Sequence, residues 1–209
     1  MGPLLFLLYI NDLAHVSTKL FSLLFADDSN MFLSGNDPNE LIRTMNIESE
    51  KVIDWLRINK LSLNLKKTHF IIFRRQRAKV KLNEELVIDN VKIKMKDSTK
   101  FLGVLIDRYL NFQDHIKYIS GKVSRGIGIL YKCKRLFHQR TLLTLYNSFI
   151  YPHLNYCNTV WCNTYSSYLE PLSKLQTRAV RMITGSRKYD HTDPLFMNLK
   201  LLKLKQIYI

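Results

Sequence analysis

The stretch FSLLFADDSNMFL, residues 21–33, decides how the first half of this chain folds. Apolar and β-forming residues stand on both sides of an acidic centre, at 20–25 before it and at 31–33 after it. This pattern predicts two short strands that meet at a turn holding Asp27 and Asp28. Asp is common at turns because its side chain bonds the local backbone, so a plain turn is one interpretation.

A metal site is the second interpretation of the same turn. Two adjacent carboxylates repel each other, and a bound cation relieves that repulsion. Mg²⁺ prefers oxygen ligands and is typically held by one or two carboxylates together with substrate phosphates. Asp27 and Asp28 are therefore candidate metal ligands.

Other segments stand in a fixed order around this turn. The chain begins MGPLLFLLYINDL and continues through LFADDSNMFL, WLRINKLSLNLKKTHFIIF and KFLGVLID. This order resembles the reverse transcriptases of non-LTR retrotransposons, the jockey-like LINE elements in particular, and here their C-terminal palm and thumb. The resemblance continues through LYNSFIYPHLNYCNTVW and LQTRAVRMITG, so it covers essentially the whole chain.

The resemblance implies roles for individual residues. In FADD, Asp27 and Asp28 match the catalytic metal ligands of the palm. Lys67, in NLKKT, matches a lysine that can protonate the departing pyrophosphate, with Lys66 as a nearby competitor. The residues expected to contact the nucleotide are Gly2 and Phe25, and those expected to contact nucleic acid are Leu102, Gly103, Lys66, Arg74, Arg75, Lys122 and Arg125.

The implied reaction is nucleotidyl transfer, in which a primer 3′-hydroxyl attacks the α-phosphate of a deoxynucleotide with the help of two Mg²⁺ ions, or Mn²⁺ in their place. The implied partners are an RNA template and a DNA primer, or an RNA/DNA hybrid. In the family a third carboxylate and part of the nucleotide pocket precede the position of Met1. We therefore expect the isolated chain to be inactive as a polymerase; its oligomeric state is left open.

The net charge of +15, from 32 basic and 17 acidic residues, favours a polyanionic partner, either nucleic acid or an acidic membrane. Between Thr68 and Val80 no acidic residue separates the basic ones, which favours phosphate contact over a merely solvated surface. Two alternatives stay open: a non-catalytic nucleic-acid-binding remnant of a decayed element, and another palm enzyme such as a group II intron maturase or telomerase.

The cysteines and the N-terminal apolar run indicate the compartment. Cys133, Cys157 and Cys162 are odd in number and lack zinc-finger spacing, which is typical of core thiols in a reducing compartment. The apolar run at 3–10 is too short to span a bilayer and lacks the features of a signal peptide. We expect an intracellular protein, nuclear or cytoplasmic, with no membrane partner.

The periodicities predict an α+β chain. The resemblance implies a polymerase palm remnant at 1–107, an antiparallel sheet with packing helices, followed by an all-helical thumb-like region at 108–209. Its helices are expected from Pro3 to about 11–14, buried because the helix is so apolar, and from Pro38 to about 59. Its later strands are expected in two pieces within 61–73 and at 86–88, 91–95 and 99–106, with Gly103 inside the last.

Four helices are expected in the second region: 113–137, about 140–161 with a kink at Pro152, 167–183 ended by Gly185, and 194–209. The aromatic residues there recur at helical spacing, which is typical of a core rather than of a base-stacking platform. They are Tyr146, Phe149, Tyr151, Tyr156, Trp161 and Tyr165.

Overall fold

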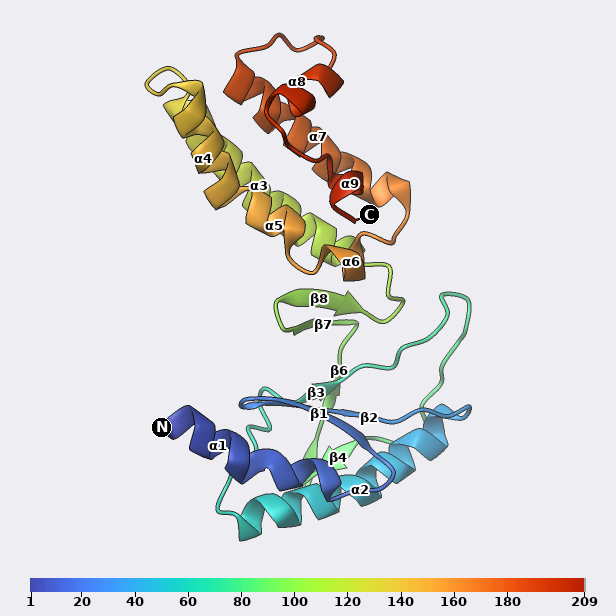
Figure 1. The fold of residues 1–209 in the computed structure, drawn as a ribbon. Coiled ribbons are helices and arrows are strands. Elements are labelled where there is room, and N and C mark those ends of the chain that lie inside the picture. Colours follow the sequence, from blue (N-terminus) through green and yellow to red (C-terminus); the bar gives the residue numbers. More distant parts are fainter. Residues whose placement is uncertain (209) are drawn as a thin grey trace. The chain divides into compact units, whose positions relative to one another are not determined.

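The structure is a computed structural model that describes residues 1–208. The chain divides into two compact units, Met1–Lys96 and Asp97–Ile209. The first unit combines helices with short strands, and the second is a hairpin followed by helices (Figure 1).

The predicted hairpin in the first unit is confirmed. Strand β1 (Phe21–Phe25) pairs antiparallel with β2 (Asp28–Phe32), and the register joins Phe25 to Asp28 at the closed end. Ala26 and Asp27 form the two-residue turn, where Ala26 has a φ of 50°. The second strand starts at Asp28 and not at residue 31, so only one of the two carboxylates lies in the turn itself.

Helix α2 (Pro38–Ile58) begins at Asp37, whose side chain accepts a hydrogen bond of 2.9 Å from the backbone N–H of Asn39. The helix buries Val52, Ile53 and Leu56 against the hairpin and the N-terminal helices. This N-terminal capping and the helical spacing of the apolar residues account for the confirmed prediction at 38–59.

A buried carboxylate joins α2 to the chain before β1. Glu48 is 1% exposed and accepts a 2.7 Å hydrogen bond from the Ser17 hydroxyl and a 2.9 Å bond from the Lys51 ammonium. These bonds, from Lys51 first and then Ser17, lower the pKa of Glu48 below its usual value.

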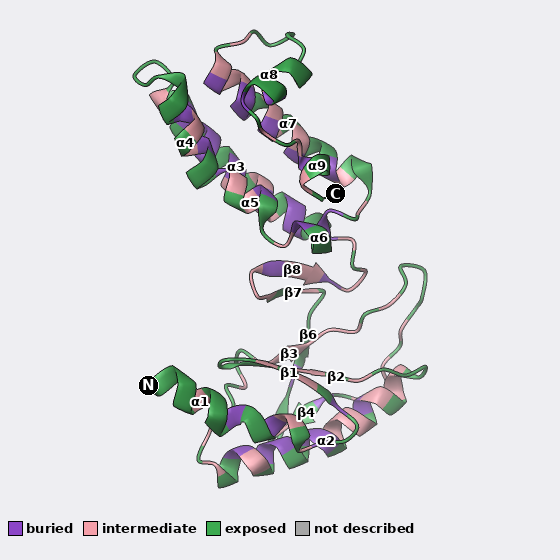
Figure 2. Ribbon diagram, viewed as in Figure 1, coloured by how far each residue is buried: buried purple, intermediate pink, exposed green. Residues whose placement is uncertain are grey.

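Helix α1 (Gly2–Ile10) and the 3₁₀ helix η1 (Asn11–His15) confirm the predicted N-terminal helix, but the expected burial of α1 is wrong. Only Ile10 of α1 is buried, whereas Leu4 is 65% and Leu8 is 68% exposed (Figure 2). The helix contacts the core through Phe6, which is partly buried, and through Ile10.

The remaining strands of the first unit are short pairs. Strands β3 (His69–Phe70) and β6 (Lys94–Met95) pair parallel, and β4 (Val87–Ile88) and β5 (Val91–Lys92) pair antiparallel across a turn at Asp89 and Asn90. Among the described residues all strands occur in separate two-stranded sheets and not in one larger sheet. The piece expected at 61–65 is not a strand, because its backbone forms a turn at Asn64.

The second unit begins with a hairpin of β7 (Ser98–Phe101) and β8 (Val104–Asp107). The prediction that Gly103 lies inside a continuous strand is therefore wrong. Leu102 and Gly103 form the turn with φ values of 43° and 89°, and glycine adopts such positive values without steric cost. The Tyr156 hydroxyl donates a 2.6 Å hydrogen bond to the Leu102 carbonyl, and a Cβ at Gly103 would lie 3.2 Å from the Tyr156 ring.

Because β8 packs on the helices, the hairpin belongs with them and not with the preceding strands. Val104 lies in the helical core, and the Leu105 N–H donates a 3.1 Å hydrogen bond to His115 Nδ1. The boundary between the two compact units thus lies between Lys96 and Asp97, whereas the sequence places it after Asp107.

The helices of the second unit are more divided than expected. The helix predicted at 113–137 ends at Cys133, the one at 140–161 breaks into three, and the last breaks into two around Lys200, which has a φ of 53°. The helix ended by Gly185 is confirmed, and of the prediction at 194–209 Ile209 lies outside the described residues. The helices are α3 (Gln113–Cys133), α4 (Gln139–Phe149), α5 (Tyr151–Asn155), α6 (Asn158–Trp161), α7 (Ser166–Thr184), α8 (Asp193–Asn198) and α9 (Leu204–Tyr208).

Helix α3 packs against both α4 and α7 and forms the main core of this unit (Figure 1). Tyr146 and Trp161 are fully buried in that core, as predicted, and Tyr151 is partly buried against it. The same prediction is wrong for Phe149, Tyr156 and Tyr165, which are 45%, 53% and 67% exposed.

The three cysteines are free thiols on this core, as expected for structural cysteines. Cys162 is buried, which raises the pKa of its thiol, and Cys133 and Cys157 are partly buried against the same residues.

A buried amide fastens the C-terminal segment to the core. Gln176 is 1% exposed; its Nε2 donates to the Tyr146 hydroxyl at 3.0 Å and to the Leu202 carbonyl at 2.9 Å, and its Oε1 accepts from the Leu204 N–H at 2.9 Å. Each polar atom of this side chain thus has a partner, as a buried amide requires.

Candidate functional site

The hairpin β1–β2 presents its carboxylates to solvent. Asp27 lies in the turn and Asp28 begins β2, and both side chains are exposed. No ion pair between described residues involves either of them. The carboxylate oxygens are therefore available to a ligand.

The two faces of the hairpin differ. Paired residues of an antiparallel ladder share a face, so Asp28 lies beside Phe25, which is 59% exposed. The opposite face carries Leu24 and Met31, which pack against the core. The outward face consists of Phe21, Leu23, Phe25, Asp28, Asn30 and Phe32.

The donor set fits one hard divalent ion. Carboxylate oxygens are the ligands that Mg²⁺ prefers, and one or two of them suffice when waters and substrate phosphates complete the coordination. Within residues 1–208 no group of three or more histidine, cysteine or acidic side chains is gathered for metal binding. Asp27 and Asp28 alone therefore do not define a site for two ions.

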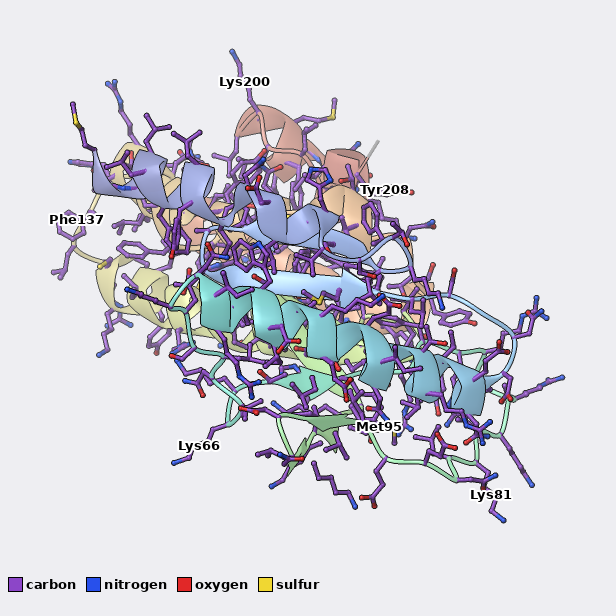
Figure 3. All side chains as sticks on the ribbon, turned by 90° about the horizontal axis from the view of Figure 1, so that it is seen from below. Lys66, Lys81, Met95, Phe137, Lys200 and Tyr208 are labelled. Carbon is purple, nitrogen blue, oxygen red and sulfur yellow. The ribbon has the colours of Figure 1, made fainter. Side chains whose placement is uncertain are left out.

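The candidate lysine Lys67 lies in the turn that follows α2. Its backbone N–H donates to the Asn64 carbonyl at 3.0 Å and to the Asn64 side chain at 3.3 Å, and Lys67 itself is exposed. Lys66 is also exposed and points away from the ribbon (Figure 3). Among described residues no ion pair joins either lysine to Asp27 or Asp28, so the role of Lys67 stays a prediction.

The basic residues at 74–81 lie on the loop that joins β3 to β4. The Arg74 guanidinium donates to the Ala78 carbonyl, and Arg75 is exposed. Lys81 also points into solvent (Figure 3). Between residues 69 and 79 this loop carries several positive side chains and no acidic one, a composition that favours phosphate contact.

The other candidate residues fall in different places. Gly2 is exposed at the start of α1. Leu102 and Gly103 form the β7–β8 turn, where Tyr156 already occupies the space beside the glycine. The predicted primer contact at this turn stays a prediction, and the intramolecular contact by itself explains why glycine stands there.

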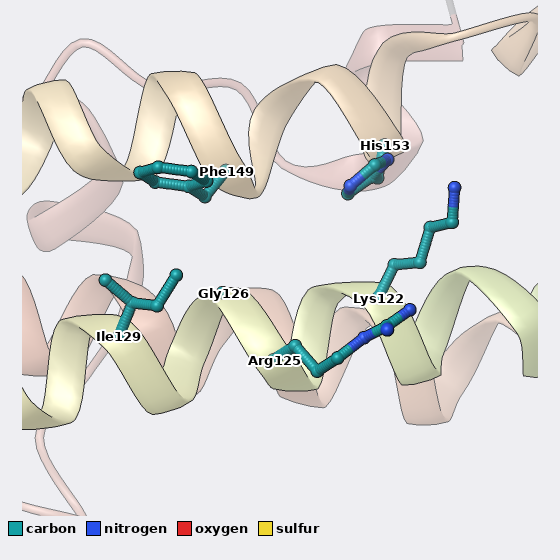
Figure 4. A pocket seen from close by; sticks show the side chains of 6 residues that line it. All are labelled: Lys122, Arg125, Gly126, Ile129, Phe149 and His153. Atoms are coloured by element: carbon teal, nitrogen blue, oxygen red, sulfur yellow. The ribbon is translucent and has the colours of Figure 1, made fainter.

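In the second unit, Lys122 and Arg125 of α3 line a cavity of about 200 Å³ together with His153 of α5 (Figure 4). Partial burial, followed by the nearby charges of Lys122 and Arg125, lowers the pKa of His153 below its usual value. The structure thus brings two of the predicted nucleic-acid contacts together and adds a histidine that the sequence analysis did not select.

Sequence reasoning also missed His115, which is 2% exposed. Burial, and to a lesser extent the charge of Lys122, lower its pKa to about 4. Its Nδ1 accepts from the Leu105 N–H, its Nε2 is buried without a partner, and its ring stands edge-on to Trp161 at 5.6 Å. The sequence did offer one indication of this burial, because residue 115 lies on the apolar face of α3.

No helix within residues 1–208 combines the length and the apolar character that crossing a membrane requires.

Comparison with known proteins gives the family context. The chain is 25% identical over 209 residues to a probable RNA-directed DNA polymerase from transposon X-element of Drosophila melanogaster, an alignment that covers 96% of this chain and 23% of that protein. This chain is a distant relative of retrotransposon polymerases. The retrotransposon relatives include a probable RNA-directed DNA polymerase from transposon BS of the same fly, 24% identical over 96% of this chain and 23% of its own length.

A third retrotransposon relative is a Pol polyprotein from type-1 retrotransposable element R1 2 of Nasonia vitripennis, 25% identical over 77% of this chain and 41% of that protein. The chain thus spans between about a quarter and two fifths of the length of these relatives. No family model and no solved structure matches the chain.

Proposed function

We propose that this chain is part of the RNA-directed DNA polymerase of a non-LTR retrotransposon, with Asp27 and Asp28 as metal ligands of its catalytic site. The observation that carries the proposal is the alignment of 96% of the chain with relatives of that name. The exposed carboxylates at the closed end of a β-hairpin support it, because a metal-dependent polymerase needs oxygen ligands on a rigid element open to its substrate.

The residues named in this proposal have distinct roles. Asp27 and Asp28 would hold Mg²⁺, or Mn²⁺, which when bound supplies positive charge against the phosphates of a deoxynucleotide. The exposed ring of Phe25 shares the face of Asp28 and would form an apolar wall beside that nucleotide. Lys67 would donate a proton to the departing pyrophosphate.

We propose further that the 209 residues alone do not extend a primer. A two-metal displacement needs two ions clamped about 3.5–4 Å apart by ligands on a rigid frame, and the described residues bring two exposed carboxylates to the hairpin. Positioning dominates this chemistry, so an incomplete clamp costs many orders of magnitude in rate.

Primer extension on an RNA template tests this proposal, with the 209-residue chain and the double variant Asp27→Ala, Asp28→Ala compared in Mg²⁺ and in Mn²⁺. We expect no extension from either. Extension that the double variant loses would contradict the proposed inactivity and would assign the two carboxylates directly. The same substitutions in a longer protein that contains this chain should abolish its polymerase activity, and retained activity there would contradict the assignment of the metal ligands.

A second candidate function is a nucleic-acid-binding module without catalysis. The net charge of +15 and the pairing of Lys122 with Arg125 in one cavity favour it. Under this alternative the double variant Asp27→Ala, Asp28→Ala binds an RNA/DNA hybrid as well as the unmodified chain, and Mg²⁺, as a competing counterion, weakens the binding of both by the same factor.

A further inference from the structure

A cavity lies between α3 and the α4–α5 segment, next to the point where these helices pack most closely. A Cβ at Gly126 would lie 2.7 Å from the Ile150 side chain and 2.9 Å from the Phe149 carbonyl, so the helices touch at this glycine. The cavity lies beside this contact, with Ile129 and Phe149 on one side and the basic groups on the other (Figure 4).

The polar side of the cavity is cationic. Lys122 and Arg125 project from α3 into the gap on the His153 side (Figure 4). No ion pair between described residues neutralises either of them, and no carboxylate lines the cavity. Two positive charges held beside a titratable imidazole repel one another unless an anion sits between them.

The size of the cavity restricts the ligand. Pockets that enclose a drug-sized molecule measure roughly 300–1,000 Å³, whereas this cavity measures about 200 Å³ and is partly open. A single phosphate group fits these dimensions better than a whole nucleotide does. The guanidinium and ammonium groups supply the donors that phosphate oxygens accept.

The positive surface continues beyond the cavity. The Lys122 ammonium lies 4.8 Å from the centre of the Tyr118 ring, and the Lys100 ammonium of β7 approaches the same ring at 5.8 Å. A hydrogen bond from Lys122 is the main cause that lowers the pKa of Tyr118. A strand whose phosphate entered the cavity would therefore meet a further cation next to it.

We infer that Lys122, Arg125 and His153 form a phosphate-binding pocket that takes one backbone phosphate of a nucleic-acid strand, with the exposed ring of Phe149 beside the attached sugar or base. This inference rests on the proposed nucleic-acid function and deepens it, since it assigns the contact to one pocket and not to the overall charge.

His153 should make phosphate binding in this pocket depend on pH. The charged groups that face His153 are Lys122 and Arg125 of α3, and the residue of α4 that lines the cavity, Phe149, is uncharged. Both cations favour the neutral imidazole. A bound phosphate reverses that balance and raises the pKa of His153, so binding takes up a proton and tightens as the pH falls from 7.5 to 5.5.

The first experiment probes the pocket with inorganic phosphate. NMR titration of His153 in the full chain, with and without phosphate at constant ionic strength, should show a higher pKa when phosphate is present. The double variant Lys122→Met, Arg125→Gln should lose this response. A pKa of His153 that phosphate leaves unchanged overturns the pocket, whether or not the chain binds nucleic acid.

The second experiment asks whether the pocket serves a strand. Binding of a labelled RNA/DNA hybrid is measured for the same double variant and for the control Lys117→Met, Lys132→Met, which removes the same charge from exposed positions of α3. We expect the pocket variant to bind about tenfold more weakly or worse and to lower the salt slope by about one, as the loss of one phosphate contact implies, with a smaller change for the control.

The outcomes separate the inference from the proposed function. Equal weakening by the two double variants overturns the assignment of the pocket to a strand. A phosphate response of His153 in a chain that binds no hybrid supports the anion pocket and counts against the nucleic-acid function.

Discussion

His115 shows how one buried side chain sets a pH limit on folding. Its Nδ1 accepts a hydrogen bond from the Leu105 N–H of the hairpin, and its buried Nε2 has no partner. Protonation of Nδ1 would break that hydrogen bond and place a positive charge in the core, so the folded state favours the neutral ring. The pKa of about 4 in the folded chain, against 6.5 for an unburied histidine, expresses this preference for the neutral ring.

We therefore expect an acid-labile fold. The unfolded chain takes up a proton at His115 below pH 6.5 and the folded chain does so only near pH 4, so the stability from this group is fully present above 6.5 and is lost as the pH falls to about 4. The free energy of unfolding should fall by up to ~1.4 kcal/mol per pH unit in that window because of His115. Urea unfolding at several pH values measures it.

His115→Gln is the matched control, since glutamine can still accept the Leu105 hydrogen bond but does not titrate. Its unfolding free energy should decline less steeply than that of the unmodified chain between pH 6.5 and 4. Parallel slopes for the two proteins would show that another group causes the acid sensitivity.

At the scale of elements, the contact between α3 and α4 depends on the absence of a side chain at Gly126. The other two glycines of α3, Gly121 and Gly128, leave open space where a Cβ would stand. The three glycines thus differ in packing although they share one helix.

Replacing each glycine by alanine should separate these roles. Gly126→Ala should lower the free energy of unfolding by ~1–3 kcal/mol, because the methyl group forces α3 away from Ile150 and the backbone of Phe149. Gly121→Ala and Gly128→Ala should raise it by up to ~1 kcal/mol through better helix propensity. Thermal or urea unfolding of the three variants decides this, and a stabilised Gly126→Ala chain would contradict the close packing.

The elements that the sequence predicted well carry their own local signals. Asp37 and Pro38 mark the start of α2, Gly185 marks the end of α7, and the β1–β2 hairpin has apolar residues on both sides of a polar centre. In these cases local chemistry and tertiary packing favour the same structure.

The elements that differ from the prediction depend on contacts with residues far away in the sequence. Strand β3 exists only because Lys94 and Met95 pair with it, and the C-terminal helix breaks where Gln176 bonds the backbone at Leu202 and Leu204. A sequence window of a dozen residues does not contain these partners. The cavity residue His153 was missed for the same reason, since Lys122 and Arg125 meet it only after α3 and α5 have packed.

Of the candidate site, the turn that holds Asp27 and Asp28 could be predicted from the sequence, and the roles of its residues stay predictions. The exposed pair Asp27 and Asp28 follows from the turn that the sequence predicts, and its openness to solvent agrees with a ligand site. The partnership of these carboxylates with Lys67 is not seen among the described contacts. The expected role of Lys67 beside these carboxylates came from the family resemblance. No local sequence pattern determines the distance between the hairpin turn and the turn that holds Lys67.

For the whole molecule, the excess of positive charge should dominate binding to nucleic acid. If the loop at 74–81 and the basic residues of α3 together contact about six phosphates, the affinity for an RNA/DNA hybrid should fall ~10³-fold between 50 and 200 mM salt, because each contact releases a counterion. Fluorescence anisotropy across that range measures the slope. Affinity that does not depend on salt, or no binding at 50 mM, would contradict a phosphate-based interface.

The contact between Tyr156 and the β7–β8 turn has a consequence for the divergence of related sequences. The ring fills the space where a side chain at Gly103 would begin, and its hydroxyl holds the Leu102 carbonyl. Positions 103 and 156 are therefore under one selective constraint although 53 residues separate them. Because the φ of 89° at position 103 admits few residues besides glycine, an alignment of many relatives should show the two positions covarying, with tyrosine at 156 where 103 is glycine and a smaller residue at 156 where 103 is asparagine or aspartate.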